Sequence, residues 1–131
     1  MLFRSTYVVT GGAITVPGTG AWCVGLQYTA LFKSASLGDT LSKQKSIDTI
    51  APILYNTHPR GLLVGQDFTT MDNLPLMYKG TPVNVDTIYP RYDSDSECFP
   101  GSWSTDTRLC LKAVAPRPCT VLAVVIAGQV T

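Results

Sequence analysis

The stretch FPGSWSTDTRLCLKAVAPRPCTVLAVVIAGQVT, positions 99–131, decides the fold class. Its run 107–114 alternates between apolar and polar residues, as a strand with one exposed face does. The corner Ala115-Pro116-Arg117-Pro118 suits a turn, because proline lacks the N–H group that a strand needs. The run 119–127 is the most apolar of the chain. We therefore predict a β-hairpin whose second strand is central in its sheet, its second face covered within the domain or by a neighbouring subunit.

The remainder of the chain repeats short strand-like runs between turn signals. Eleven glycines and nine prolines recur along it, and no stretch keeps the 3.6-residue period of a helix. Gly11-Gly12 predicts a hairpin turn between strands at 6–10 and 13–16, followed by a strand at 21–26. The pattern predicts an all-β fold, an antiparallel β-sandwich or barrel-like domain with little or no helix. We expect a single β-domain over residues 1–131.

The run 46–55 is predicted to be a long strand. The odd-numbered residues from Ile47 to Tyr55 would share one face and the even-numbered residues the other. Pro52 cannot donate a hydrogen bond to a neighbouring strand. We therefore expect a bulge or an edge position at Pro52.

Composition excludes several classes of function. The net charge is +1 and the ten Lys and Arg residues are scattered, so the chain lacks the basic stripe of a nucleic-acid-binding protein. The longest apolar run, 121–127, is too short to cross a bilayer, and the N-terminus lacks the apolar core of a signal peptide. Only 15% of residues are charged. This low share of charged residues is typical of a subunit covered by neighbours. The alternative is a free surface that is polar because it is rich in Ser and Thr.

The four cysteines do not have the spacing of a zinc site. No two of the four cysteines have C-x₂-C spacing; they are Cys23, Cys98, Cys110 and Cys119. The only histidine, His58, is distant from them in sequence. A Cys110–Cys119 disulfide is conceivable across the predicted hairpin. Free buried thiols in a protein assembled in the cytosol are the alternative.

The other polar residues do not form a recognisable catalytic set. His58 lies beside Pro59 in a turn, without a Ser or Cys motif to pair with, which favours a solvated histidine over a general base. Asp93, Asp95 and Glu97 alternate as in a cation-binding loop, but the residues that follow break the calcium pattern. We predict a solvated acidic loop, with a weak calcium site as the alternative. No catalytic, cofactor-binding or metal-ligating residue is assigned, and an enzyme is not expected.

The aromatic residues have two interpretations. Trp22, Trp103 and the six tyrosines could stack on sugars, as in a carbohydrate-binding module. In an all-β domain such residues more often anchor the core or an interface.

Five short motifs, in order along the chain, carry a family resemblance. They are Thr10-Gly11-Gly12-Ala13-Ile14-Thr15-Val16-Pro17, Val24-Gly25-Leu26-Gln27-Tyr28-Thr29, Gln44-Lys45-Ser46-Ile47, Phe99-Pro100-Gly101-Ser102-Trp103 and Pro118-Cys119-Thr120-Val121-Leu122-Ala123. In these motifs the chain resembles the C-terminal β-domain of the tail-tube, or nozzle, proteins of short-tailed double-stranded DNA bacteriophages, which include proteins that stabilise packaged DNA. Family members carry several hundred residues ahead of this domain, whereas here a Met precedes it almost directly. The chain is thus either a stand-alone protein or a fragment.

The resemblance implies a structural protein without catalytic residues or cofactors. It implies homo-oligomers, six-fold in the family, that contact other virion proteins after assembly in the host cytoplasm. The physical counterpart would be copies that pair along exposed sheet edges into a ring, tube or fibre.

Two other functions fit an all-β chain. One is a β-sandwich binding module that recognises a carbohydrate or a host receptor. The other is a small jelly-roll coat protein, although the sequence lacks a basic genome-binding arm. For each of these functions a central strand at 119–127 predicts that Leu122→Asp or Val124→Asp abolishes folding.

Overall fold

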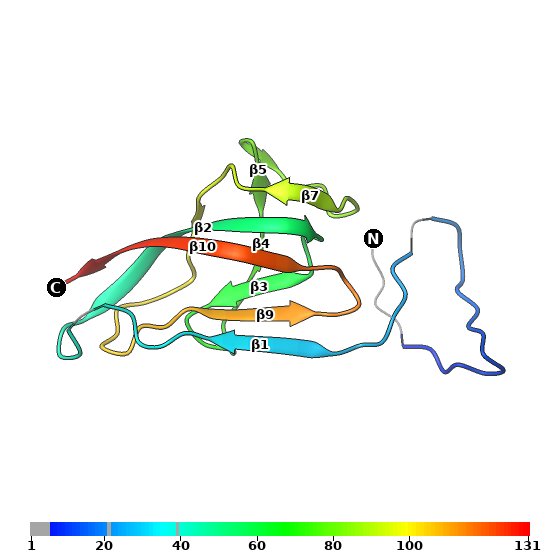
Figure 1. The fold of residues 1–131 in the computed structure, drawn as a ribbon, viewed down its shortest axis with the longest axis horizontal. Helices are drawn as coiled ribbons and strands as arrows, with labels where there is room; N and C mark the ends of the chain where they lie inside the picture. The colour runs from blue at the N-terminus through cyan, green and yellow to red at the C-terminus, as the bar shows by residue number, and fades with distance from the viewer. Residues whose placement is uncertain (1–5, 21, 39) are drawn as a thin grey trace.

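The computed structural model describes residues 6–20, 22–38 and 40–131. These residues form strands and loops without a helix, which confirms the predicted all-β class. Their strands make two antiparallel sheets, stacked as a sandwich, and one small hairpin (Figure 1).

The first sheet has the strand order β1-β9-β3-β4. Its strands are β1 (Thr29–Lys33), β9 (Cys110–Val114), β3 (Leu62–Gly65) and β4 (Asp72–Leu74). In the centre, Leu111 of β9 pairs with Phe32 of β1 on one side and with Val64 of β3 on the other. β1 is therefore one free edge of this sheet.

The second sheet has the order β10-β2-β7, and β8 also pairs with β2. Its strands are β10 (Thr120–Val130), β2 (Lys45–Thr57), β7 (Tyr89–Tyr92) and β8 (Glu97–Cys98). The separate hairpin joins β5 (Met77–Tyr78) to β6 (Thr81–Pro82). β10 is a free edge of the second sheet, as β1 is of the first.

Two bulges set the faces of β2 and β10. Where β10 passes from Ala127 to Gly128, β2 contains the extra residue Asp48. This extra residue reverses the alternation, so that Ile47 is buried and so are the even-numbered Ile50, Pro52 and Leu54. The prediction that Ile47 shares a face with the following odd-numbered residues was therefore wrong, because a bulge shifts the period-two pattern by one.

Pro52 lies in the middle of the central strand β2, in register with Val124 of β10. The predicted bulge or edge position at Pro52 was therefore wrong. On the side of β2 away from β10, β8 pairs with Thr49 and Ile50, and β7 pairs from Leu54 onward. Residues 51–53 lie in the gap between these two partners. The missing N–H of Pro52 therefore falls at a locally unpaired position.

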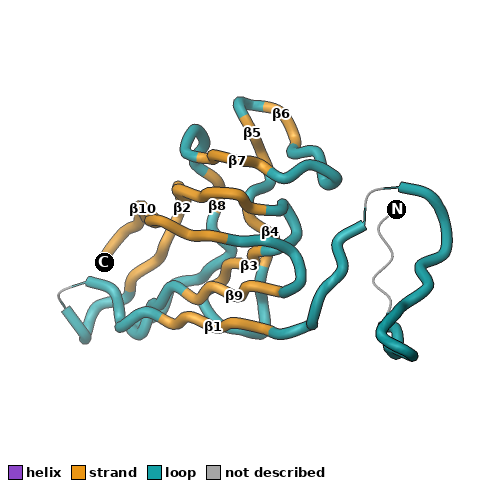
Figure 2. The backbone as a smooth tube through the Cα atoms, turned by 45° about the vertical axis from the view of Figure 1, so that its right-hand side comes forward, coloured by secondary structure: helices purple, strands orange, loops and turns teal. Residues whose placement is uncertain are grey.

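The core lies between the two sheets and is best closed on one side. Ile50 and Leu54 of β2, Leu62 of β3, Leu74 of β4 and Tyr92 of β7 are all exposed by no more than 1%. On the opposite side, β1 and β10 do not pair with each other, so the sheets form a sandwich and not a closed barrel (Figure 2).

The predicted hairpin in the last quarter of the chain was wrong. β9 and β10 belong to different sheets, and the corner 115–118 carries the chain from one layer to the other. The central strand is β9, whose second face is covered where Cys110 Sγ lies 3.4 Å from the carbonyl of Gln66. β10 is an edge strand, with Leu122 and Val125 at least 60% exposed.

The predicted strands before residue 27 were also wrong. Gly11 and Gly12 do form a turn, both at positive φ, and one bridge joins Thr10 to Ala13. The flanking residues, and residues 22–28, are not in strands, while Ala21 lies outside the described residues. These segments have strand-like sequences but, apart from the Thr10–Ala13 bridge, do not pair with another strand within the described residues.

Candidate assembly surface

An apolar groove of about 640 Å³ runs along the open side of the sandwich, between β1 and β10. Its lining is apolar except for Ser34 and consists of Ala30, Leu31, Phe32, Ser34, Leu37, Leu62, Leu109, Leu111, Ala113, Cys119, Val121, Leu122, Val124 and Ile126. Three of the larger lining residues, Leu31, Phe32 and Leu122, are more than half exposed. The groove is therefore an uncovered continuation of the core, because Val121, Val124 and Ile126 pack on the core from the same strand.

The groove is bordered by two unpaired sheet edges. β1 pairs only with β9, and β10 pairs only with β2, among the strands of the described residues. Each edge thus presents backbone N–H and C=O groups that another strand could use. Natural edge strands are commonly protected by charged side chains, yet residues 118–131, which include all of β10, contain no charged residue.

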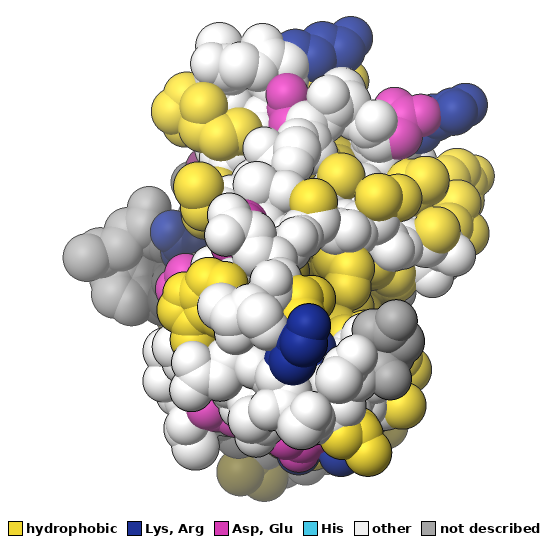
Figure 3. Space-filling view, turned by 90° about the vertical axis from the view of Figure 1, so that its left-hand side faces the viewer, with side chains coloured by type: hydrophobic (Ala, Val, Ile, Leu, Met, Phe, Trp, Pro, Cys, Tyr) yellow, Lys and Arg dark blue, Asp and Glu magenta, His cyan; other side chains and the backbone are white. Residues whose placement is uncertain are grey.

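Figure 3 shows how the side chains are distributed on one end of the molecule. Hydrophobic side chains form a group toward its right-hand edge and smaller groups elsewhere, and charged side chains are scattered among them. Exposed apolar groups of this kind on a small domain are typical of an interaction site.

The N-terminal arm, residues 6–28, extends away from the two sheets (Figure 1). None of its described residues is buried, and only Ile14 and Val16 are partly covered. Tyr7, Val8 and Val9 near its start are 40%, 86% and 64% exposed. Like β10, the arm is neutral: no residue from 5 to 32 is charged.

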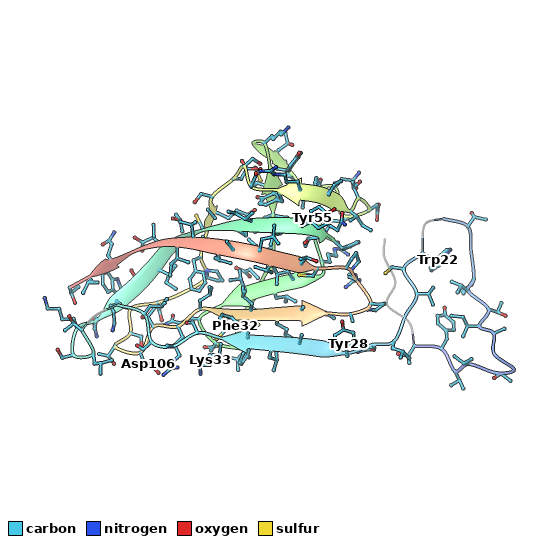
Figure 4. All side chains as sticks on the ribbon, viewed as in Figure 1. Trp22, Tyr28, Phe32, Lys33, Tyr55 and Asp106 are labelled. Atoms are coloured by element: carbon cyan, nitrogen blue, oxygen red, sulfur yellow. The ribbon has the colours of Figure 1, made fainter. Side chains whose placement is uncertain are left out.

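The arm is attached to the sandwich at its C-terminal end. The amide of Ala115 donates to the carbonyl of Tyr28 at 2.9 Å, and Cys23 Sγ lies 3.2 Å from the carbonyl of Pro116. Gly25 packs so closely here that a Cβ would come within 2.8 Å of Pro116 Cβ. Figure 4 places Trp22 beyond this contact, far from Phe32 in the groove.

The exposed area is large for a chain of this mass. The solvent-accessible surface is 8356 Å² for 14.1 kDa. A compact monomer of that mass exposes about 6,700 Å². The excess of roughly 1,600 Å² on one chain is about twice the roughly 800 Å² that each partner contributes to a standard protein–protein interface.

His58 is not the solvated turn residue that the sequence predicted. It does lie in a turn after β2, but it is only 7% exposed, and its Nδ1 accepts a hydrogen bond of 3.0 Å from the amide of Arg60. Burial lowers the pKa of His58, and the nearby Arg117 and Arg60 lower it further. The sequence did not reveal the cause, which is that the turn packs against the corner where the amide of His58 donates to the carbonyl of Pro118.

The acidic loop is also only partly solvated. Glu97 is 6% exposed, and its Oε1 accepts hydrogen bonds from the amides of Leu76 and Met77 and from the Tyr92 hydroxyl, at 2.7, 3.0 and 2.9 Å. Asp95 accepts from the amide of Lys79 at 2.6 Å, and Asp93 pairs with Arg91 in solvent. Two of the three carboxylates therefore fasten the β5–β6 hairpin to the second sheet.

The cysteines and tryptophans do not converge on one site. All four cysteines are free thiols: Cys110 is buried, Cys119 lines the groove, and the other two are exposed. Burial raises the pKa of the Cys119 thiol, which keeps this part of the groove uncharged. Trp22 and Trp103 are each about half exposed, at 50% and 45%, and neither lines the groove.

Comparisons with known proteins found no relative of this chain, which matches no protein-family model, no curated protein and no solved structure. Within the described residues, no group of three His, Cys, Asp or Glu side chains could hold a metal ion. That part of the chain also contains no helix with the length and apolar character needed to cross a membrane.

Proposed function

We propose that this chain is a structural subunit of a virion, a tail or nozzle-type β-domain that assembles with copies of itself into a ring, tube or fibre. The observation that carries the proposal is the open side of the sandwich. There an apolar groove lies between two edges, β1 and β10, that have no outer strand within the described residues and carry one charged residue, Lys33 at the end of β1. Water contact with such a surface is unfavourable, and its burial by another copy would contribute roughly 25 cal/mol per Å² before the costs of association. The resemblance to phage nozzle proteins supplies the particular type of subunit.

The low charge of the surface supports assembly in a second way. Packing a neutral edge against another copy does not require a charged group to lose its hydration, which would cost several kcal/mol per ion. The uncharged residues 5–32 and 118–131 include all of β10 and all of β1 except its last residue, Lys33. An arm without Lys or Arg is unsuited to neutralising phosphates, which argues against the jelly-roll coat protein.

Sedimentation velocity over a range of protein concentrations, followed by negative-stain microscopy, tests this proposal. We expect oligomers well above 14.1 kDa and closed rings or tubes with a central channel. Six-fold class averages would support the nozzle type, and another symmetry would argue against it. A monomer at every concentration would contradict the proposed function altogether.

A carbohydrate-binding module is the second candidate, favoured by the exposure of Trp22 and Trp103. Against it, neither tryptophan lines the groove, so a sugar stacked on either ring would not be enclosed there. Glycan binding by a monomer, lost on Trp22→Ala or Trp103→Ala, would favour this candidate over assembly.

A further inference from the structure

The groove on the open side and the start of the N-terminal arm are complementary. The groove between β1 and β10 has apolar walls and free strand edges but nothing that covers it within the described residues. The start of the arm, Thr6–Val16, has strand-like residues and a formed turn but no described strand that it pairs with. Both are free of charge. We propose that the Thr6–Val16 segment of one copy fills the groove of a second copy. This inference rests on the proposed self-assembly.

The turn at Gly11-Gly12 prepares the segment for this role. The amides of Thr10 and Ala13 each donate to the other residue's carbonyl at 3.2 Å, so the chain already reverses as in a hairpin. The two limbs, 6–10 and 13–16, contain β-branched and aromatic side chains suited to a sheet. The turn is therefore in place before docking, and less backbone entropy is lost on binding.

The limbs match the groove in length. A limb of five residues spans roughly 17 Å as a strand, at about 3.3 Å per residue. The residues of β10 that line the groove run from Val121 to Ile126, which is roughly 20 Å at the same rise per residue. A limb paired with the free edge of β10 would turn alternate side chains into the groove, onto Leu122 and Phe32.

The root of the arm favours a second copy over the arm's own groove. Cys23 and Gly25 hold the root against Pro116, and the chain ahead of them extends away from the sheets (Figure 4). To enter its own groove, the segment would have to reverse direction between Val16 and this contact. Docking in a neighbour requires no reversal.

Exchange of this kind has a consequence for architecture. Each copy has one arm and one groove, so each both donates and accepts. Such head-to-tail contacts close into a ring, or continue as a filament when the rotation does not close. The excess exposed area of roughly 1,600 Å² is enough for one such interface per copy.

Cysteine cross-linking tests the contact. The variant Val8→Cys/Leu122→Cys is made with Cys23 and Cys98 replaced by serine and Cys119 by alanine, and it is oxidised with copper phenanthroline. Val9→Cys/Leu122→Cys is made in parallel, because neighbouring residues of a strand point to opposite faces. The matched control is Val8→Cys/Ile88→Cys, since Ile88 is 48% exposed but does not line the groove.

We expect one of the two Leu122 pairs to give dimers and larger covalent oligomers on a non-reducing gel, at least tenfold faster than the control pair. A monomer with an internal disulfide would overturn the proposal, since the arm would then occupy its own groove. Oligomers in sedimentation without cross-linking above the control would overturn the arm exchange and leave self-assembly intact. A chain that stays monomeric would refute the proposed function, and the arm exchange with it.

A second variant separates docking from folding. Val9 is 64% exposed, so Val9→Asp should leave the unfolding midpoint unchanged. If the arm docks in an apolar groove, Val9→Asp should raise the concentration for half-assembly at least tenfold. Thr19→Asp, in the exposed loop of the same arm, is the control and should have no such effect. Equal assembly of the Val9→Asp variant and the natural chain would contradict the proposal.

Discussion

The two sides of the sandwich differ in how completely the hydrophobic core is covered. On the closed side, around Ile50, Leu54 and Tyr92, apolar residues are buried and the Glu97 carboxylate accepts hydrogen bonds that fasten the outer hairpin. On the open side, the core continues into the groove and two edge strands have no outer neighbour within the described residues. The closed side accounts for the fold of one chain. The open side is explained only if something else covers it.

The strongest test of this contrast truncates one leucine on each side. Leu54 is fully buried, so Leu54→Ala should lower the free energy of unfolding by about 2–5 kcal/mol. Leu122 is 64% exposed, so Leu122→Ala should cost less than about 1 kcal/mol in the monomer. Urea denaturation at low protein concentration measures both. Similar losses would mean that the open side is core.

Charged substitutions at two positions of β10 should differ in the same way, one affecting folding and the other affecting assembly. Val124 packs on the core and Leu122 is the bulge residue beside it. Val124→Asp should cost about 1–3 kcal/mol because a carboxylate is forced toward apolar neighbours. Leu122→Asp should fold with an unfolding midpoint close to that of the natural chain but fail to assemble in sedimentation. This corrects the prediction that either charge abolishes folding, since β10 is an edge and not a central strand.

A hydroxyl on the closed side offers a smaller effect. The Tyr92 hydroxyl lies between the carbonyl of Met77 and Oε1 of Glu97, and burial together with Glu97 raises its pKa. Tyr92→Phe should cost about 1–2 kcal/mol, because the buried acceptors lose their donor. Tyr55, half exposed on the outer surface, is the control, and Tyr55→Phe should be neutral. A neutral Tyr92→Phe would mean that the closed side does not depend on this network.

The smallest expected effect concerns pH. The pKa of His58 is lowered by burial from its ordinary value of about 6.5. The unfolded chain therefore binds the proton more readily, and stability should fall as the pH drops through about 6.5, levelling below the folded pKa. The free energy of unfolding at pH 7.5 and 5.5 measures this slope, which His58→Asn should remove. An unchanged slope in that variant would assign the pH dependence to other groups.

The sequence predicted the fold class correctly, but the prediction assigned the central position to the wrong strand of the last quarter. Alternation in 107–114 suggested a half-exposed strand, yet β9 lies between β1 and β3, and the chain near Gln66 covers Cys110 on its second face. Continuous apolarity in 119–127 suggested a central strand, yet β10 is an edge. The local hydrophobic pattern of a sequence indicates which side chains avoid water, but it does not indicate which element or subunit covers them. An apolar edge therefore resembles a core strand in sequence.

The functional residues were partly visible in the sequence. The groove could not be predicted, because it joins residues of β1 and β10, 87 or more positions apart. One signal was available: the two longest uncharged stretches, 5–32 and 118–131, contain the arm, β10 and all of β1 except Lys33. The burial of His58 and Glu97 was missed, because each depends on a segment that the chain brings in from elsewhere.

Hydrogen–deuterium exchange at several protein concentrations tests the central claim most directly, because it reports on the arm and the edge in the same sample. We predict that the amides of residues 6–16, and those amides of residues 120–126 that point away from β2, exchange slowly above the assembly concentration and quickly below it. Amides of β2 and β3, on the closed side, should be protected at every concentration. Exchange in the arm and β10 that is independent of concentration would contradict the claim that the open side is completed by a second copy.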